Sequence, residues 1–116
     1  MSTQTIDVAY SSLTGIRFYN SKGEQFNGDL ICPSSGCTFE FRQKAGSTGW
    51  TFDNFTTARV SGPPVQFSKS VANTNISVVD PGNQVPEESL YNYTISIDTG
   101  THQVFFDPKI KNTGGN

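Results

Sequence analysis

The chain has 116 residues and a formal net charge of −2, and 34% of its residues are hydrophobic. Nucleic-acid backbones are bound by several clustered cations, and the sequence has no basic stripe, so nucleic-acid binding is not expected. No apolar run approaches the ~18 residues of a membrane helix, which argues against membrane insertion. This length suits one domain, and we predict a single domain over residues 1–116 with a frayed tail over residues 110–116.

Residues 1–7 contain neither a basic segment nor an apolar one, so no secretion signal is predicted and a cytoplasmic location is the default expectation. A chain whose signal had been cleaved would look the same at this end, so the compartment stays open. The apolar area is concentrated in nine Phe, four Tyr and one Trp, while strong helix formers are scarce. This composition favours β structure.

Short strands separated by turn residues are predicted along the whole chain, because apolar and polar side chains alternate with a period of two. No helix is predicted. Gly62-Pro63-Pro64 excludes helix continuation and central-strand pairing at its own residues. In chain order, the predicted strands cover residues 6–10, 16–20, 30–32, 38–42, 50–52 with an extension toward 55, 65–68 at a sheet edge, 75–80, 90–98 and 103–108.

Turn signals at intervals of roughly 8–12 residues are typical of an all-β fold. We predict a single antiparallel Greek-key β-sandwich of about 7–9 strands, immunoglobulin-like or cupredoxin-like. The closing pair of strands is the clearest part of the pattern. In immunoglobulin-like sandwiches, a tyrosine hydroxyl near this position bonds to upstream backbone; Tyr91 is the first candidate for that role and Tyr93 the second.

The segment Asp107-Pro108-Lys109-Ile110-Lys111-Asn112 resembles the Asp-Pro-x-Ile-x-Asn tail of the DP-EP family, a group of small, functionally uncharacterised bacterial proteins. The resemblance covers only the closing part of the chain, and no Glu-Pro dipeptide is present. It implies a soluble bacterial protein with no activity attached. Independently, Pro108 lacks an N–H and ends ladder pairing, and Asp107 is expected to accept bonds from the backbone amides that follow it.

The two cysteines, Cys32 and Cys37, flank the turn sequence Pro-Ser-Ser-Gly. A reducing cytosol favours two free thiols, and a disulfide is the second alternative, although a short loop gains comparatively little stability from one. A metal pair is the least favoured alternative, because zinc and redox motifs use a two-residue spacing and His102 is the one histidine. No metal site or cofactor is predicted.

Catalytic chemistry finds little support in the residue inventory. A type-1 copper site needs two His, one Cys and usually an axial Met, whereas this chain has one His and one Met. His102 is interpreted as a solvated turn residue rather than a general base or pH sensor. No Gly-x-Ser-x-Gly elbow occurs, and the turn Asp80-Pro81-Gly82-Asn83 is not interpreted as a calcium loop. We therefore predict that the protein is not an enzyme.

Three aromatic residues carry the functional hypotheses. Phe105 is out of phase with Val104 and Phe106, so it must face the opposite side of its strand, where an exposed apolar residue indicates a partner. We predict a non-enzymatic structural or protein-interaction module that self-associates through Phe105. The alternative is a glycan-binding module that uses Trp50 or Tyr19 as a platform, although Trp50 is interpreted first as a core residue. A small enzyme is the third hypothesis.

Overall fold

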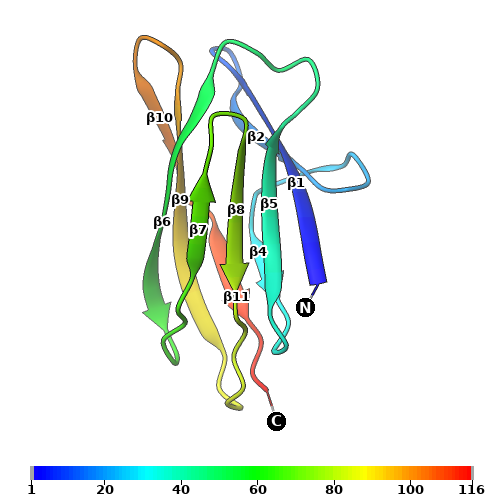
Figure 1. Ribbon diagram of the computed structural model, residues 1–116, viewed down its shortest axis with the longest axis vertical. Helices are drawn as coiled ribbons and strands as arrows, with labels where there is room; N and C mark the ends of the chain where they lie inside the picture. Colours follow the sequence, from blue (N-terminus) through cyan, green and yellow to red (C-terminus); the bar gives the residue numbers. More distant parts are fainter. Residues whose placement is uncertain (1, 116) are drawn as a thin grey trace.

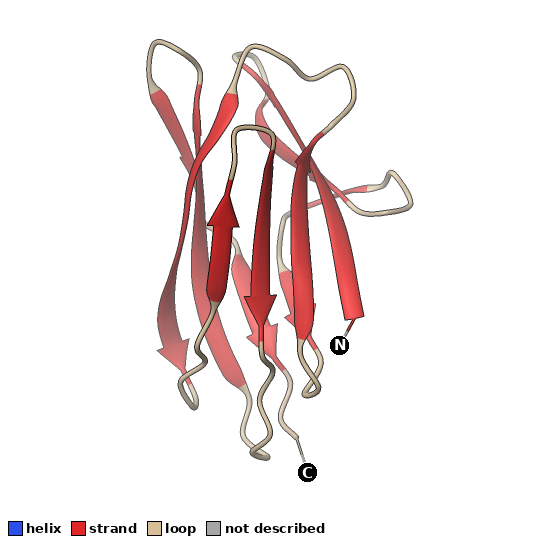
Figure 2. Cartoon of the chain, in the orientation of Figure 1, coloured by secondary structure: helices blue, strands red, loops and turns tan. Residues whose placement is uncertain are grey.

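The computed structural model describes residues 2–115; Met1 and Asn116 lie outside the described residues. Within that range the chain forms strands and no helix, which confirms the predicted all-β class (Figure 2). The strands are β1 (Ser2–Ser11), β2 (Gly15–Tyr19), β3 (Gln25–Phe26), β4 (Leu30–Cys32), β5 (Cys37–Gln43), β6 (Thr51–Ser61), β7 (Ser68–Val71), β8 (Asn75–Asp80), β9 (Ser89–Asp98), β10 (Gln103–Phe106) and β11 (Lys109–Asn112).

The strands form two sheets that share one core (Figure 1). The first sheet has the order β3-β2-β1-β5-β8-β7. The second is built around β9, which pairs with β6 along one edge and with β10 and then β11 along the other, while β4 pairs with β11. This arrangement is compatible with a β-sandwich, and it places β9 in the middle of the second sheet.

The prediction of purely antiparallel pairing is wrong at two places. β1 pairs with β5 in parallel, from Ser2 opposite Cys37 to Val8 opposite Gln43. β4 also pairs with β11 in parallel, with Leu30 opposite Ile110. Parallel neighbours need a long crossover, and here the chain passes through the opposite sheet between the two members of each pair. Local alternation carries no information about that route.

The frayed tail predicted over residues 110–116 is also wrong within the described residues. β11 lies between β9 and β4, Ile110 and Asn112 are fully buried, and Gly115 N donates to Val85 O at 2.7 Å. Asp107 does not cap the amides after it: its carboxylate accepts the Thr94 hydroxyl at 2.6 Å. Pro108 does interrupt the ladder, as expected for a residue without an N–H, but a new strand begins directly after it.

β6 is longer than its apolar residues indicate. A register shift between Phe52 and Asn54 forms an irregularity at Asp53, and the extra residue allows both Phe52 and Phe55 to face the core. Beyond Phe55 the strand continues to Ser61 through pairing with β9. Two further boundaries differ from the prediction: β3 was not expected, and the strand predicted at residues 65–68 is β7, at Ser68–Val71.

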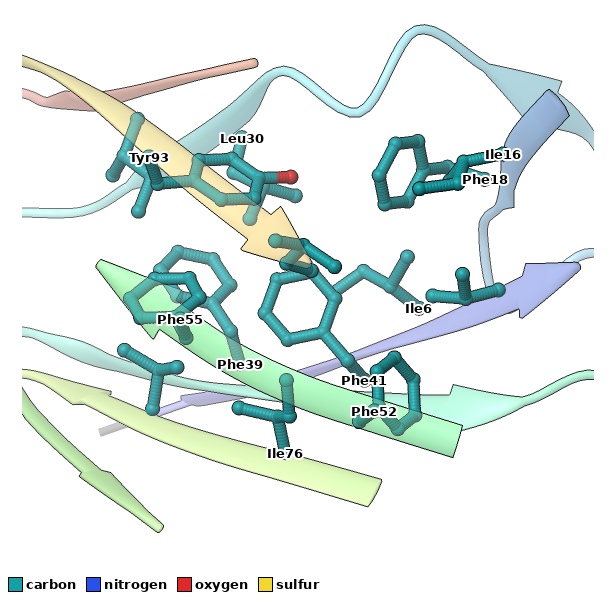
Figure 3. Packing of buried hydrophobic residues seen from close by; sticks show 14 of the residues in the cluster. Ile6, Ile16, Phe18, Leu30, Phe39, Phe41, Phe52, Phe55, Ile76 and Tyr93 are labelled. Atoms are coloured by element: carbon teal, nitrogen blue, oxygen red, sulfur yellow. The ribbon is translucent and has the colours of Figure 1, made fainter. Parts of the chain in front are cut away.

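The core consists of aromatic and β-branched side chains from the inward faces of both sheets (Figure 3). Phe55 stacks on Tyr93 with 5.4 Å between ring centroids, and Phe41 contacts both rings. The Tyr93 hydroxyl donates to Gly28 O at 2.5 Å, whereas the Tyr91 hydroxyl accepts Val65 N at 2.7 Å. Both tyrosines therefore bond to upstream backbone, but across the fold rather than within a local corner.

Candidate functional site

A hollow of about 400 Å³ opens beside the outer face of the first sheet, around Tyr19. Ala9 on β1 lies opposite Arg17 on β2, and Lys44 follows the last residue of β5, which is the neighbour of β1 on its other side. The Arg17 guanidinium lies 5.9 Å from the centroid of the Tyr19 ring, and the Lys44 ammonium lies 5.0 Å from it. Two cations thus cover the ring that the sequence presented as a bare platform.

Trp50, the other candidate platform, lies in the core. Its side chain is 4% exposed, packs edge-to-face on Phe52 with 5.0 Å between centroids, and donates its indole N–H to Ser47 Oγ at 2.9 Å. A sugar ring cannot stack on a buried indole, so the interpretation of Trp50 as a platform does not hold. Ser47 also lines the hollow around Tyr19, which links the indole to that site by one hydrogen bond.

A larger cleft, of about 550 Å³, lies beside β1 and β4. Its amide and carboxylate side chains are already engaged. Gln4 Nε2 donates to Ile31 O at 2.8 Å, and Asp29 accepts the backbone N–H of Lys109 at 3.0 Å and the side-chain amide of Asn27 at 3.1 Å. Because few free polar groups remain to orient a ligand, size alone does not make this cleft a binding site.

The two cysteines connect the sheets at one end of the molecule. Cys32 ends β4 in the second sheet, Cys37 begins β5 in the first, and both are free thiols with no exposed surface. Cys37 lies opposite Asp80 in its sheet, and Cys32 lies opposite Asn112 in the other. We name these four residues the thiol cluster. The turn between the cysteines packs so closely on Gly82 that a Cβ there would lie 2.3 Å from Ser34 O.

Burial governs the electrostatics of the thiol cluster. It raises the pKa of the Cys32 thiol far above its ordinary value, and the neighbouring Asp80 carboxylate raises it further. Burial also raises the pKa of the Cys37 thiol and that of the Asp80 carboxyl. The Gly82 N–H donates to Asp80 Oδ1 at 2.9 Å, and this hydrogen bond partly offsets the rise in the Asp80 pKa. Both thiols are therefore held protonated, whereas a nucleophile or metal ligand must be a thiolate.

Among residues 2–115, no hydrogen bond joins His102 to an Asp–Ser pair. Asp53, displaced onto the outer face by the β6 irregularity, accepts the Ser96 hydroxyl at 2.9 Å and the Gln103 side-chain amide at 2.8 Å. The His102 ring is exposed, and Thr101 Oγ1 and Thr99 Oγ1 lie 2.9 Å and 3.2 Å from its Nδ1. Asp53 and Ser96 thus make a structural pair without the base that a triad needs.

Phe105 lies on β10 with 60% of its surface exposed. Its neighbour Phe106 turns the other way and contacts Phe18, with 5.2 Å between ring centroids, so the predicted phase of this strand is confirmed. Among residues 2–115, β10 pairs with β9 alone, and Phe105 lies opposite Ser96. The other edge of β10 is therefore not paired with any strand among residues 2–115.

Within the described part of the chain, no group of three or more His, Cys, Asp or Glu is placed to hold a metal ion. In the same range, no helix is long and apolar enough to cross a membrane.

Comparison with known proteins adds little to this geometry. No family model matches the chain, and no curated protein matches it. Among solved structures, the chain is similar to an NMR structure of a protein from Bacteroides thetaiotaomicron, at 11% sequence identity and a TM-score of 0.45. That match covers 76% of this chain and 79% of the other. A likeness at this level carries no argument about function.

Sequence reasoning named Tyr19 and the two cysteines but missed the residues that complete each cluster. Arg17 and Lys44 were not linked to Tyr19, because the parallel β1–β5 pairing that brings Lys44 near is invisible to local patterns. The sequence places Asp80 at the end of a strand and the start of a turn, and it places Asn112 in the tail, so neither is linked to the cysteines. A weak signal existed for Arg17, since residues i and i+2 of a strand share a face.

Proposed function

We propose that this protein is a non-enzymatic interaction module that self-associates through β10. The observation that carries the proposal is Phe105, which is 60% exposed on a strand that pairs along only one edge within residues 2–115. An unpaired edge offers backbone N–H and C=O groups to another strand, and an exposed aromatic side chain gains from burial in a contact. A second copy fits both features, because two antiparallel β10 strands pair around a two-fold axis.

Support for a non-enzymatic role comes from the state of the candidate catalytic groups. The thiols are buried and protonated, and the exposed His102 contacts neither Ser96 nor Asp53 in any hydrogen bond of the structure. These groups lack the mutual geometry from which a nucleophile and its base are recognised.

The native mass spectrum of the purified protein tests self-association. The wild type should give a dimer or larger species, and Phe105→Ser should shift it toward monomer, while far-UV circular dichroism stays unchanged. Leu13→Ser is the matched control, because Leu13 is 96% exposed in a turn away from β10, and its loss should leave the dimer intact. A wild-type monomer across the accessible concentration range would overturn the proposal.

The finer fold assignment belongs to the same proposal. We infer a Greek-key sandwich of the cupredoxin-like rather than the immunoglobulin-like type, because immunoglobulin sheets are antiparallel whereas β1 and β5 pair in parallel over seven positions. A relation to the DP-EP family, with a bacterial origin, rests on the tail sequence alone, and a cytoplasmic location rests on the composition of residues 1–7. In support of a structural role for that tail, Ile110 and Asn112 both point into the fold.

Glycan binding around Tyr19 is the second candidate function. A specific observation favours it: the hollow there has the size of a small-ligand site and is lined by hydroxyl, aromatic and cationic side chains. Titration of the wild type with a panel of neutral and charged oligosaccharides, followed by calorimetry, tests this candidate. The absence of any binding across the panel would remove it.

A further inference from the structure

The hollow around Tyr19 has a small residue at its centre and long side chains around it. Ala9 is the central residue, and its own side chain is nearly completely buried. Arg17 flanks it on β2, Lys44 flanks it beyond β5, and Tyr19 lies one row further along the sheet, opposite Asp7. The charged ends of Arg17 and Lys44 both lie over the Tyr19 ring.

Neither cation has an anionic partner among residues 2–115. The Arg17 guanidinium makes no hydrogen bond, and its Nε atom is buried without an acceptor. Lys44 Nζ makes no ion pair and contacts the Tyr19 ring alone. Asp7, which lies opposite Tyr19 on β1, is bound to Arg42 at 3.1 Å, and no described residue that lines the hollow carries a carboxylate. A buried donor without an acceptor is costly unless something accepts its hydrogen bond.

The rest of the lining determines what kind of anion fits. The volume of about 400 Å³ is larger than a bare ion requires and falls within the range of small-ligand sites. The hydroxyl-bearing residues Ser47 and Thr48 line it together with the two cations, whereas the Tyr10 side chain packs against the core. Such a set suits a molecule that carries both an anionic group and several hydroxyl groups.

We propose that this hollow binds an acidic sugar, a ring whose carboxylate is held between Arg17 and Lys44 and whose hydroxyl groups face the Ser47–Thr48 loop. This inference deepens the second candidate function, glycan binding, by naming the chemical class of its ligand. Tyr19 acts by holding the two cations in place rather than by stacking on the sugar.

A pair of ligands that differ only in the carboxylate tests the inference. Methyl glucuronide and methyl glucoside are titrated into the wild type by calorimetry, with sodium sulfate as the free-anion probe. The indole N–H signal of Trp50 is followed by NMR, because its hydrogen-bond acceptor Ser47 lines the hollow. The variants are Arg17→Gln and Lys44→Gln, with Lys109→Gln on β11 as the control of equal charge change; circular dichroism verifies folding.

The expected result is binding of the glucuronide with a shift of the indole signal, and affinity for the glucoside lower by roughly tenfold or more. Arg17→Gln and Lys44→Gln should each weaken glucuronide binding about tenfold, since charge-assisted hydrogen bonds are the strong ones, and Lys109→Gln should not. Sulfate binding as tight as glucuronide binding would overturn the assignment of a sugar. Equal binding of both glycosides, or of neither, would overturn the inference, whereas the oligosaccharide panel decides separately on glycan binding.

Discussion

Two polar clusters of opposite character lie at the two ends of β5. Cys37, at its start, belongs to the thiol cluster, which is sealed between the sheets, and Lys44, just past its end, reaches over the open hollow around Tyr19. In the thiol cluster, the Cys32 thiol and the Asn112 amide lie close enough to Asp80 to lower its pKa against the effect of burial. Beside the hollow, Arg17 Nε is buried without a hydrogen-bond partner among the described residues. Solvent access, rather than residue type, therefore decides which of these polar side chains can meet a ligand.

The rate at which a reagent reaches the two thiols should depend strongly on whether the protein is folded. Because both cysteines are fully buried, a thiol-reactive probe such as Ellman's reagent should label them only when the surrounding structure opens. We expect labelling in the native protein to be slower than in denaturant by about a thousandfold or more. Fast labelling of either cysteine under native conditions would contradict the burial of the thiol cluster. The cluster would then be as accessible to solvent as the hollow around Tyr19.

One glycine beside each cluster has nearly the same φ angle, but the two differ in how closely other atoms surround them. Gly82, with φ of 86°, packs on the turn between the cysteines, whereas Gly46, with φ of 85°, has open space around it beside the hollow. Gly82→Ala should lower the free energy of unfolding by about 2–4 kcal/mol, because a Cβ would strike backbone atoms on both sides of that turn. Gly46→Ala should cost only the left-handed strain, about 1 kcal/mol. Urea unfolding of both variants measures the difference, and equal losses would mean that packing at Gly82 is looser than described.

A smaller change in the free energy of unfolding is expected from the Asp80 carboxyl. Burial raises the pKa of Asp80, so the folded state favours the protonated carboxyl. The stability that this preference contributes is fully present below the ordinary pKa of 3.8. It is lost as the pH rises through the pKa that Asp80 has in the folded protein. At neutral pH, therefore, the burial of this carboxyl counts against the folded state. Asp80→Asn keeps the acceptor for the Gly82 N–H and should raise the free energy of unfolding at pH 7 by about 1 kcal/mol.

The control for this variant is its own pH dependence. The advantage of Asp80→Asn over the wild type should shrink when unfolding is measured below about pH 4, where Asp80 is protonated in both folded and unfolded chains. An advantage that stays constant from pH 7 to pH 3 would show that packing, and not the charge of Asp80, causes the gain.

Much of the fold could be predicted because its strands carry their own alternation. Residues 30–32 and 75–80 match β4 and β8 at both ends, since turn residues bound a short apolar pattern on either side. The second half of β6 could not be found in this way: residues 56–61 have no apolar alternation and form a strand because β9 pairs with them. Likewise, β11 has a polar residue, Asn112, at an inward position, which disguised its period.

The candidate sites were predictable to a lesser degree, because each depends on chain segments far apart in sequence. The phase of Phe105 followed from its own strand and is confirmed. The pairing of Lys44 with Tyr19 depends on two neighbours of β1, one antiparallel and one parallel, and no local pattern encodes the second. The thiol cluster similarly requires that residues 32 and 112 lie in adjacent strands.

The parallel ladder between β4 and β11 also has a consequence for the order in which the molecule is built. Leu30 is synthesised well before its partner Ile110, so β4 emerges from the ribosome long before the strand that covers its edge. Until then its hydrogen-bonding groups, with Cys32 at its end, remain without their native partner. Pairings this distant slow folding and leave strand edges open to aggregation. Pairing of β11 therefore completes the neighbourhood of β4 late in synthesis, and Cys32 gains its partner Asn112 only then.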